Sequence, residues 1–246
     1  MDRKVAIVTG GTGGIGTAIC QKLSQEFQVV ACYFKNGQHE QAQQWRDEQR
    51  RLGFDIDIRY ANIAQYEDCS QLVHEIIEVY NRIDVLVNNA GITKDSRLVN
   101  MTLEQWQQVL DSNLTSVFNM TRNVIPFMLE KAYGRVVSIS SINGRKGQFG
   151  QCNYAASKAA LYGFTKSLAL EVAKKGITVN TISPGYIKTP MLASMKPEIL
   201  DSIISNIPIG RLGEPEEIAN AVAFLVSPES GFMTGANLDI NGGQYM

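Results

Sequence analysis

The sequence predicts one α/β domain, with a doubly wound parallel sheet of about seven strands and helices on both faces. Short apolar runs rich in β-branched residues alternate with longer segments of helical periodicity, which is the pattern of βαβ units. A glycine-rich segment separates the first apolar run from the first helical one. The 246 residues, 44% apolar and 19% charged, suit one continuous core without repeat or linker, so residues 1–246 are predicted to be a single domain.

Charge and hydropathy exclude several classes of function. The net charge is −1 and the pI is about 6.2, which gives no electrostatic basis for binding nucleic acid or an anionic membrane surface. No apolar run approaches the ~18–20 residues that span a bilayer, and the first residues lead directly into a short strand rather than a cleavable signal. We therefore expect a cytoplasmic protein with no nucleic-acid or membrane partner.

The cysteines lie far apart in the chain and form no Cys-x-x-Cys pair. Only two histidines could join them as soft metal ligands. We expect free, buried thiols and no metal site. The residues concerned are Cys20, Cys32, Cys69, Cys152, His39 and His74.

The first predicted strand, residues 5–9, runs into a glycine-rich turn at residues 10–16, and a helical pattern follows. Glycines let backbone N–H groups approach a pyrophosphate, and the helix N-terminus adds partial positive charge. The segment favours a dinucleotide site in a Rossmann-like fold; an ordinary tight turn is the alternative. The turn residues expected to contact the cofactor are Gly10, Thr12, Gly13, Gly14, Ile15 and Gly16.

The end of the second predicted strand, residues 29–34, bears on the choice of cofactor. An NAD enzyme needs an acid there for the adenosine ribose, and none is present. Lys35 could instead meet a 2′-phosphate, so we favour NADP(H) over NADH, although Lys35 could also be an ordinary surface lysine. Asn62, just past the third predicted strand, is placed to read the adenine edge or simply to form a turn.

The next segments complete one βαβαβ half and begin the second. Helices are expected at 38–51 and 67–80, and strands at 56–62 and 83–87. Asn89, Ala90 and Gly91 then allow the backbone to pass close to a flat cofactor, while asparagine side chains at 88 and 89 can brace neighbouring strand ends. A capping box at residues 102–105 starts a helix, and Asn113 precedes a long helix, 114–131, with Pro126 as a candidate kink.

Ser141 and the pair Tyr154 and Lys158 carry the expected chemistry. The fifth predicted strand, residues 134–141, delivers Ser141 at its carboxyl end, where open α/β sheets bind ligands. A helix at about 151–174 places Tyr154 and Lys158 on one face, where the ammonium would lower the phenol's pKa and make it a general acid for carbonyl reduction. The alternative is a solvated lysine beside a partly buried ring.

The last third is predicted to close the sheet and cover the site. A sixth strand, 177–183, ends in a Pro184-Gly185 turn, and residues 188–209 hold three prolines between helical pieces, as in a mobile substrate lid. A helix starts at 214–215, and residues 236–240 form the final strand.

The helices 114–131 and 151–174 carry apolar residues on more than one side, which one sheet face cannot cover. We hypothesise that both helices also pack against a second subunit. The apolar residues are Val117, Phe118, Val124, Ile125, Phe127, Met128, Leu161, Phe164, Leu168 and Leu170.

Taken together and in order, these motifs resemble a short-chain dehydrogenase/reductase over essentially the whole chain. The motifs are Thr9-Gly10-x-x-x-Gly14-x-Gly16, Asn88-Asn89-Ala90-Gly91, Asn113, Ser141, Tyr154-x-x-x-Lys158 and Pro184-Gly185. The resemblance implies that Tyr154 protonates a carbonyl that accepts the nicotinamide hydride, and that Ser141 stabilises the oxyanion. It also implies that Lys158 holds the nicotinamide ribose and that Asn113 bends its helix and retains a relay water. Further cofactor contacts are implied at Pro184, Gly185 and Ile187.

Within that family, residues 143–151, 184–187 and the C-terminal segment look most like the NADPH-dependent acetoacetyl-CoA reductases of polyhydroxybutyrate synthesis. The likeness implies an acyl-CoA substrate, an (R)-3-hydroxyacyl product and a homotetramer. By the same likeness Gln148, Phe149, Gln151 and Tyr186 would line the acyl pocket, with loop packing as the alternative reading.

Two departures and two rival functions remain open from the residues alone. The second strand lacks an arginine pair for the 2′-phosphate, and Lys188 and Pro190 stand where relatives often have smaller or acidic residues, so that Lys188 would face either the CoA phosphates or water. A 3-oxoacyl-acyl-carrier-protein reductase would share the catalytic residues. A catalytically silent dinucleotide-binding regulator would share the fold but not need the serine, tyrosine and lysine set.

Overall fold

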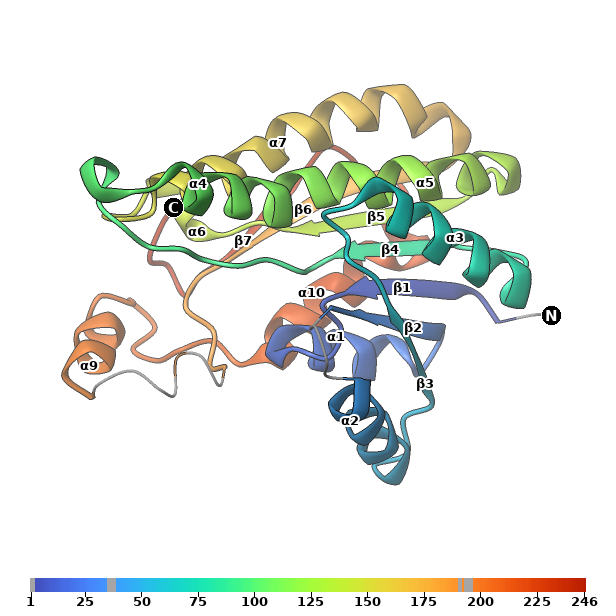
Figure 1. Cartoon of the computed structure of the whole chain (residues 1–246), viewed down its shortest axis with the longest axis horizontal. Coiled ribbons are helices and arrows are strands. Elements are labelled where there is room, and N and C mark those ends of the chain that lie inside the picture. The colour runs from blue at the N-terminus through green and yellow to red at the C-terminus, as the bar shows by residue number, and fades with distance from the viewer. Residues whose placement is uncertain (1–2, 35–38, 190–191, 193–196) are drawn as a thin grey trace.

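One seven-stranded sheet, entirely parallel, organises the protein in this computed structural model, which describes residues 3–34, 39–189, 192 and 197–246. The strand order is β3-β2-β1-β4-β5-β6-β7, a doubly wound arrangement whose direction switches between β1 and β4. All strands therefore end on one edge, on the left in Figure 1. The strands are β1 Val5–Thr9, β2 Gln28–Tyr33, β3 Ile56–Tyr60, β4 Val85–Asn88, β5 Gly134–Ile139, β6 Ile177–Pro184 and β7 Asn237–Ile240.

Helices cover both faces of the sheet, as predicted. Helices α3, α5 and α7 lie on one face, and α1, α2 and α10 on the other, while α6 and α9 lie near the carboxyl edge (Figure 1). Their bounds are α1 Gly14–Leu23, α2 His39–Arg51, α3 Tyr66–Tyr80, α4 Leu103–Leu110, α5 Ser116–Lys131, α6 Ile142–Lys146, α7 Cys152–Val172, α9 Pro197–Ser205 and α10 Pro215–Val226. Short η turns occupy Leu98–Asn100, Asp111–Thr115, Ala173–Lys175 and Pro228–Ser230.

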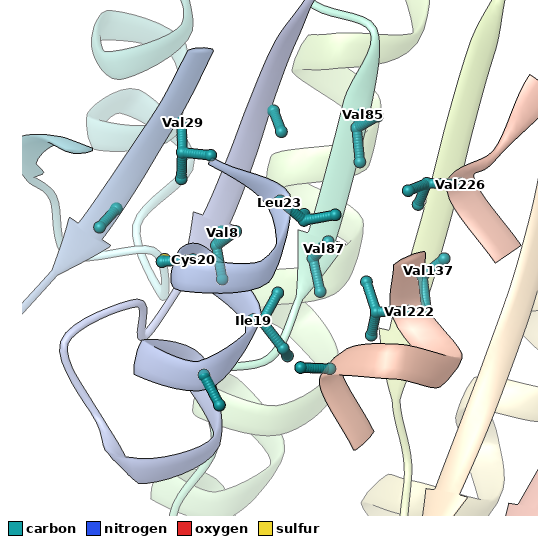
Figure 2. Packing of buried hydrophobic residues seen from close by; sticks show 14 of the residues in the cluster. Val8, Ile19, Cys20, Leu23, Val29, Val85, Val87, Val137, Val222 and Val226 are labelled. Carbon is teal, nitrogen blue, oxygen red and sulfur yellow. The ribbon is translucent and has the colours of Figure 1, made fainter. Parts of the chain in front are cut away.

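The core has two layers because successive strand residues point to opposite faces. In β1, Val5 and Ile7 join the cluster under α3 and α5, whereas Ala6 and Val8 join the cluster under α1 and α10. Figure 2 shows this second layer, in which strand valines meet Ile19 and Leu23 of α1 and side chains of α10. Each large apolar side chain so buried contributes about 1.5–3 kcal/mol. This layer holds the α1 N-terminus against the end of β1.

Every expected strand is present, but several bounds differ. The third strand ends at Tyr60 rather than 62, because Asn62 lies in a turn. The Asn62 side-chain oxygen accepts a hydrogen bond there from Ala64 N at 3.3 Å. The fourth begins at Val85 rather than 83, because Asp84 precedes the ladder and its carboxylate accepts from Val5 N at 2.8 Å. The fifth ends at Ile139, so that Ser141 lies two residues beyond the strand and caps a short helix.

Local signals for helix starts held, and one expectation about a cysteine did not. The capping box at Thr102 and Gln105 is present in both directions. The long helix continues through Pro126 to Lys131, and the kink at Pro126 stays a prediction. Cys152 is exposed rather than buried, because it stands at the first position of α7 beside an exposed loop; Cys20, Cys32 and Cys69 are free and buried as expected.

Membrane and metal signals are missing from the residues that the structure describes. None of their helices combines the length and apolar character needed to cross a bilayer. No group of three or more His, Cys, Asp or Glu side chains gathers there in a way that could hold a metal ion.

Candidate active site

The carboxyl edge of the sheet brings together most of the residues that the sequence singles out. The ends of β1, β4, β5 and β6 are neighbours there, so the glycine turn, the 88–91 segment, Ser141 and Pro184 meet at one edge. Helix α7 runs from this edge along β6 and carries Tyr154 and Lys158 (Figure 1).

The glycine turn between β1 and α1 has no room for side chains at two positions. A Cβ at Gly16 would stand 2.1 Å from the Gly10 carbonyl oxygen, and one at Gly11 2.6 Å from Ala31 Cβ. Gly10 adopts φ 62°, a conformation that glycine reaches at low cost. At the α1 N-cap, Gly13 supplies no side-chain hydrogen bond, so the first helical N–H groups are left to a ligand or water. This bare, positively polarised turn fits a dinucleotide pyrophosphate.

The end of β4 is braced against the end of β1. Thr9 Oγ1 accepts from the backbone N–H of Asn89 at 3.0 Å and of Ala90 at 3.2 Å, and Asn89 Nδ2 donates to the Thr9 carbonyl at 2.9 Å. Asn88 Nδ2 donates to Thr121 and Ser138 on α5 and β5. The expected bracing by asparagines is therefore present. The Asn89 side-chain amide and backbone N–H are both engaged within the protein, which leaves its backbone carbonyl for any cofactor contact.

Asn113 is fully buried in a π turn, Asp111–Thr115, between α4 and α5. Its Oδ1 accepts from Ile92 N at 2.8 Å, and its Nδ2 donates to the Ile92 carbonyl at 3.0 Å and to Ser157 Oγ at 3.1 Å. The π turn is the local bend expected at Asn113. It ties the segment after β4 to α7 one turn above Tyr154, because Ser157 Oγ donates to the Tyr154 carbonyl.

Ser141, Tyr154 and Lys158 lie together at the carboxyl end of β5. Ser141 is buried, caps α6 by accepting from Asn143 N at 3.1 Å, and forms a side-chain hydrogen bond with Tyr154. Lys158 Nζ is 5.8 Å from the Tyr154 ring centroid and donates to the Ile139 carbonyl at 2.8 Å. A Cβ at Gly91 would stand 3.3 Å from Lys158 Nζ, so the 88–91 segment packs directly against the buried ammonium.

The pKa of Tyr154 is shifted in the direction opposite to the prediction. Burial raises the pKa of the phenol, a nearby Asp95 carboxylate raises it further, and the Ser141 hydrogen bond opposes both. The expected net lowering of the Tyr154 pKa is wrong, because burial of the ring raises the pKa by more than its neighbours lower it. Burial also lowers the pKa of Lys158 to about 8. Tyr154 is consequently a protonated acid at neutral pH.

The remaining candidate cofactor positions differ in what they contact. Asn62 donates its N–H to Asp68 at 3.2 Å and forms a side-chain turn, the second of its two expected roles. Pro184 ends β6, and a Cβ at Gly185 would stand 2.8 Å from Asn241 Cα. Ile187 is buried and bridges to Gly213. Lys35 and Pro190 lie outside the described residues.

The four expected substrate residues occupy the rim of this edge. Gln148 and Phe149 are exposed, with Phe149 77% exposed and the Arg97 guanidinium 5.3 Å from its ring centroid. Gln151 and Tyr186 are half-buried. Gln151 Nε2 donates to Asp95 Oδ2 at 2.8 Å, and burial followed by the Asp95 charge raises the pKa of Tyr186. Lys188 is exposed and pairs with Glu214 at 3.4 Å.

A cavity of about 460 Å³ adjoins Tyr186, between the turn after β6, residues 207–213 and the C-terminal residues. Ile207, Ile209 and Tyr245 supply apolar and aromatic walls. Helix α9 lies in the segment expected to form a lid, of which residues 190–191 and 193–196 are outside the described part. Closure of this segment stays a prediction.

Comparisons with known proteins agree with this arrangement. A family model described as "Enoyl-(Acyl carrier protein) reductase", one of the short-chain dehydrogenases/reductases, matches residues 10–244. The chain is 49% identical to the acetoacetyl-CoA reductase of Cupriavidus necator over 100% of both chains, and 48% identical to that of Allochromatium vinosum over 99% of both. The protein belongs to the short-chain dehydrogenase/reductase family.

Other members of the family are also similar. A 3-oxoacyl-[acyl-carrier-protein] reductase of Vibrio cholerae is 41% identical over 100% of this chain and 99% of its own. The solved structure of gox2181 superposes with a TM-score of 0.93 at 33% identity, covering 99% of this chain and 96% of that one. The fold of this short-chain dehydrogenase/reductase is therefore the predicted Rossmann-like α/β domain.

The sequence of this short-chain dehydrogenase/reductase did not point to one residue at the site, Asp95. Asp95 contacts Gln151 and influences both Tyr154 and Tyr186. It lies in a segment with neither helical nor strand periodicity, so pattern analysis gave it no place. Its position seven residues beyond the end of a central strand was the available signal, since residues after such strands gather at the ligand edge.

Proposed function

We propose that the protein reduces acetoacetyl-CoA to (R)-3-hydroxybutyryl-CoA with NADPH. The observation that carries the proposal is the meeting of Ser141, Tyr154, Lys158 and Asn113 at the carboxyl edge, next to a glycine turn that fits a pyrophosphate. The identity of 45–49% to acetoacetyl-CoA reductases over nearly whole chains supports the choice of substrate. The proposed setting is the cytoplasm, where the product would enter polyhydroxybutyrate synthesis.

In this mechanism the chain's own residues handle the carbonyl oxygen and its proton. When bound, the reduced nicotinamide supplies the hydride. Tyr154, held protonated by burial, donates its proton to the oxygen that becomes the alcohol. Ser141 Oγ already accepts from Asn143 N, so its hydroxyl proton, which faces Tyr154, would turn to the developing oxyanion and stabilise it.

Lys158 and Asn113 would serve the cofactor and the return of the proton. The Lys158 ammonium lies beside the end of β5 and against Gly91, where it would donate to the nicotinamide ribose hydroxyls. Asn113, fixed by its three hydrogen bonds in the π turn, would hold the water that returns a proton to Tyr154. Pro184, Gly185 and Ile187 would border the nicotinamide from β6.

The proposed preference for NADPH rests on the end of β2. The described residues there, Tyr33 and Phe34, include no carboxylate to hold a ribose 2′-hydroxyl, and the next residue is Lys35. NADH is the less favoured cofactor. A ratio of kcat/KM values for NADPH over NADH below one would reverse this assignment.

The acyl-CoA thioester would enter over the rim formed by Gln148, Phe149, Gln151 and Tyr186. Phe149 is exposed and close to Arg97, which suits a flexible, partly apolar chain ending in phosphates. The 188–209 segment would cover the bound thioester as a lid.

The same active site on a different carrier is the second candidate function. A reductase of 3-oxoacyl-acyl-carrier-protein is favoured by the 41% identity to the Vibrio cholerae protein and by the family model's description. Steady-state NADPH oxidation should be measured with acetoacetyl-CoA and with acetoacetyl-acyl-carrier-protein. We expect a higher kcat/KM for the CoA thioester, and the opposite order would transfer the assignment to the protein carrier.

A variant of the candidate acid separates an enzyme from a cofactor-binding regulator. Tyr154→Phe keeps the ring and removes the proton donor, so NADPH affinity should stay within a few-fold while kcat falls by about 10²-fold or more. NADPH fluorescence titration and single-turnover oxidation give the two values. Full kcat in Tyr154→Phe would remove Tyr154 from the mechanism.

A further inference from the structure

Asp95 lies outside the residues with proposed roles, yet its backbone is fixed to the start of α7. Asn153 Nδ2 donates to the Lys94 carbonyl at 3.1 Å, and Ser96 N donates to the Gly150 carbonyl at 2.8 Å. Asn153 is fully buried and directly precedes Tyr154. The backbone on both sides of Asp95 is held in this way, and its exposed carboxylate is placed by the hydrogen bond that it accepts from Gln151.

A directed chain of side-chain hydrogen bonds runs from Asp95 to Asn143, whose backbone binds Ser141. Asp95 Oδ2 accepts from Gln151 Nε2 at 2.8 Å, and Gln151 Oε1 accepts from Asn143 Nδ2 at 2.9 Å. The backbone N–H of the same Asn143 donates separately to Ser141 Oγ at 3.1 Å. A carboxylate can only accept, so Asp95 fixes which end of the Gln151 amide faces Asn143.

Asn143 depends on this chain for its side-chain orientation. The residue is buried, and within the part of the chain that the structure describes its Oδ1 has no hydrogen-bond partner. The bond from its Nδ2 to Gln151 is therefore the contact that orients the amide. A rotated Gln151 would present its amide N–H group to the Asn143 Nδ2 donor, and the side-chain anchor of the residue whose backbone N–H binds Ser141 would be lost.

We propose that Asp95 is a positioning residue that acts through Gln151 and Asn143 to orient Ser141 for carbonyl reduction. The inference rests on the proposed function, since Ser141 is the group that meets the reacting oxygen. Asp95 then has a role distinct from substrate contact, because it fixes the orientation of the Gln151 and Asn143 side chains next to the serine. A misplaced donor loses transition-state stabilisation with little change in ground-state binding.

The Asp95 charge gives a second, independent readout at Tyr154. Besides burial, the carboxylate raises the pKa of both Tyr154 and Tyr186. The other charged or titratable groups facing Tyr154 are Lys158 and Tyr162, both on α7. Removal of the Asp95 charge should therefore lower the pKa of Tyr154, whether or not the hydrogen-bond chain survives.

The test compares Asp95→Asn, which keeps an oxygen to accept from Gln151, with Asp95→Ala, which does not. With acetoacetyl-CoA and NADPH, Asp95→Ala should lower kcat about tenfold while KM stays within about twofold. Asp95→Asn should retain kcat within about twofold. Gln151→Ala should lower kcat by a similar factor and, because Gln151 also lines the proposed acyl pocket, should raise KM as well. The kcat of the double variant should be no lower than that of either single variant. Asp47→Asn, an exposed carboxylate on α2, is the control.

Three kinetic results would overturn the proposal. These are wild-type kcat in Asp95→Ala, equal losses in the Asn and Ala variants, and a raised KM with unchanged kcat, which would mean direct substrate contact. Thermal unfolding of each variant excludes loss of the fold as the cause.

An ultraviolet titration of tyrosinate, referenced to the same variant carrying Tyr154→Phe, needs no substrate. It should show a lower Tyr154 pKa in both Asp95 variants, and an unchanged value would contradict the placement of Asp95. If the wild type reduces neither thioester, the proposed function fails while this titration still decides where Asp95 acts.

Discussion

Lys158 is a buried ammonium on α7. Its position suits the proposed reaction but lowers the free energy of unfolding. The residue is 3% exposed, and its Nζ donates to the Ile139 carbonyl. Burial lowers its pKa to about 8. In the unfolded chain the same group titrates near pH ~10.4. Below pH 8 the native protein must therefore hold a charge that water would solvate better.

The pH dependence of stability should reveal this group. Between about pH 8 and 10 the unfolded chain keeps a proton that native Lys158 has lost, so stability rises with pH over this window. Relative to Lys158→Met, the wild type should gain about 2–3 kcal/mol of unfolding free energy between pH 7 and 10. Urea unfolding of both proteins at both pH values measures the double difference. Parallel pH dependence in the two proteins would contradict a depressed Lys158 pKa.

At the scale of single residues, sequence reasoning located the chemistry better than it judged the electrostatics. The four-residue spacing of Tyr154 and Lys158 and the strand before Ser141 follow from periodicity, and the structure brings the three together. The sign of the Tyr154 pKa shift did not follow, because desolvation depends on how the finished fold covers the ring. Asp95 was not predicted for a related reason, because it lies in an irregular segment without helical or strand periodicity.

At the scale of elements, residue periodicity predicted the order of strands and helices, but not where the elements stop. The strand at 83–87 appears as Val85–Asn88 because the Asp84 carboxylate binds the start of β1 and the Arg82 guanidinium. That interaction joins residues 79 positions apart and has no local signature. Helix starts were more predictable, since a capping box such as Thr102 with Gln105 is contained in four residues.

The glycine turn between β1 and α1 should tolerate an added methyl group at Gly13 but not at Gly16. A Cβ at Gly16 would stand 2.1 Å from the backbone oxygen of Gly10, which cannot move without opening the turn. Gly16→Ala should lower the free energy of unfolding by about 2 kcal/mol or more, despite a gain in helix propensity of ~1 kcal/mol. Chemical denaturation of the purified proteins measures the change.

Gly13 provides a matched control in the same turn. Its φ is −84°, and an added Cβ would lie 3.4 Å from the Gly10 oxygen, an ordinary contact. Gly13→Ala should therefore cost no more than about 1 kcal/mol, because alanine is a poorer N-cap than glycine and no close contact adds to that difference. Equal losses in the two variants would mean that glycine is needed there for flexibility rather than for close approach.

At the scale of the whole molecule, the outer surface of α5 and α7 retains apolar side chains that the sheet does not cover. The two helices cover the same face of the sheet in Figure 1, and Phe118 is 49% exposed on α5 and Leu170 86% exposed on α7. Val117, Val124 and Leu161 are buried, so the wide apolar stripe of each helix is divided between the core and the surface. This division is what a helix serving both a core and a subunit interface requires.

Association through this face should be broken by charge. A stable interface buries roughly 1,200–2,000 Å² in total, and a carboxylate placed at its apolar centre would be desolvated without a partner. We expect the wild type to sediment as a homo-oligomer, with a tetramer as the proposed state, and Phe118→Glu with Leu170→Glu to shift it toward smaller species at micromolar concentration. Leu52→Glu, an exposed leucine following α2, should leave the assembly unchanged. A wild type that sediments as a stable monomer would show instead that these side chains face water, and the width of the apolar stripe would then need another physical cause.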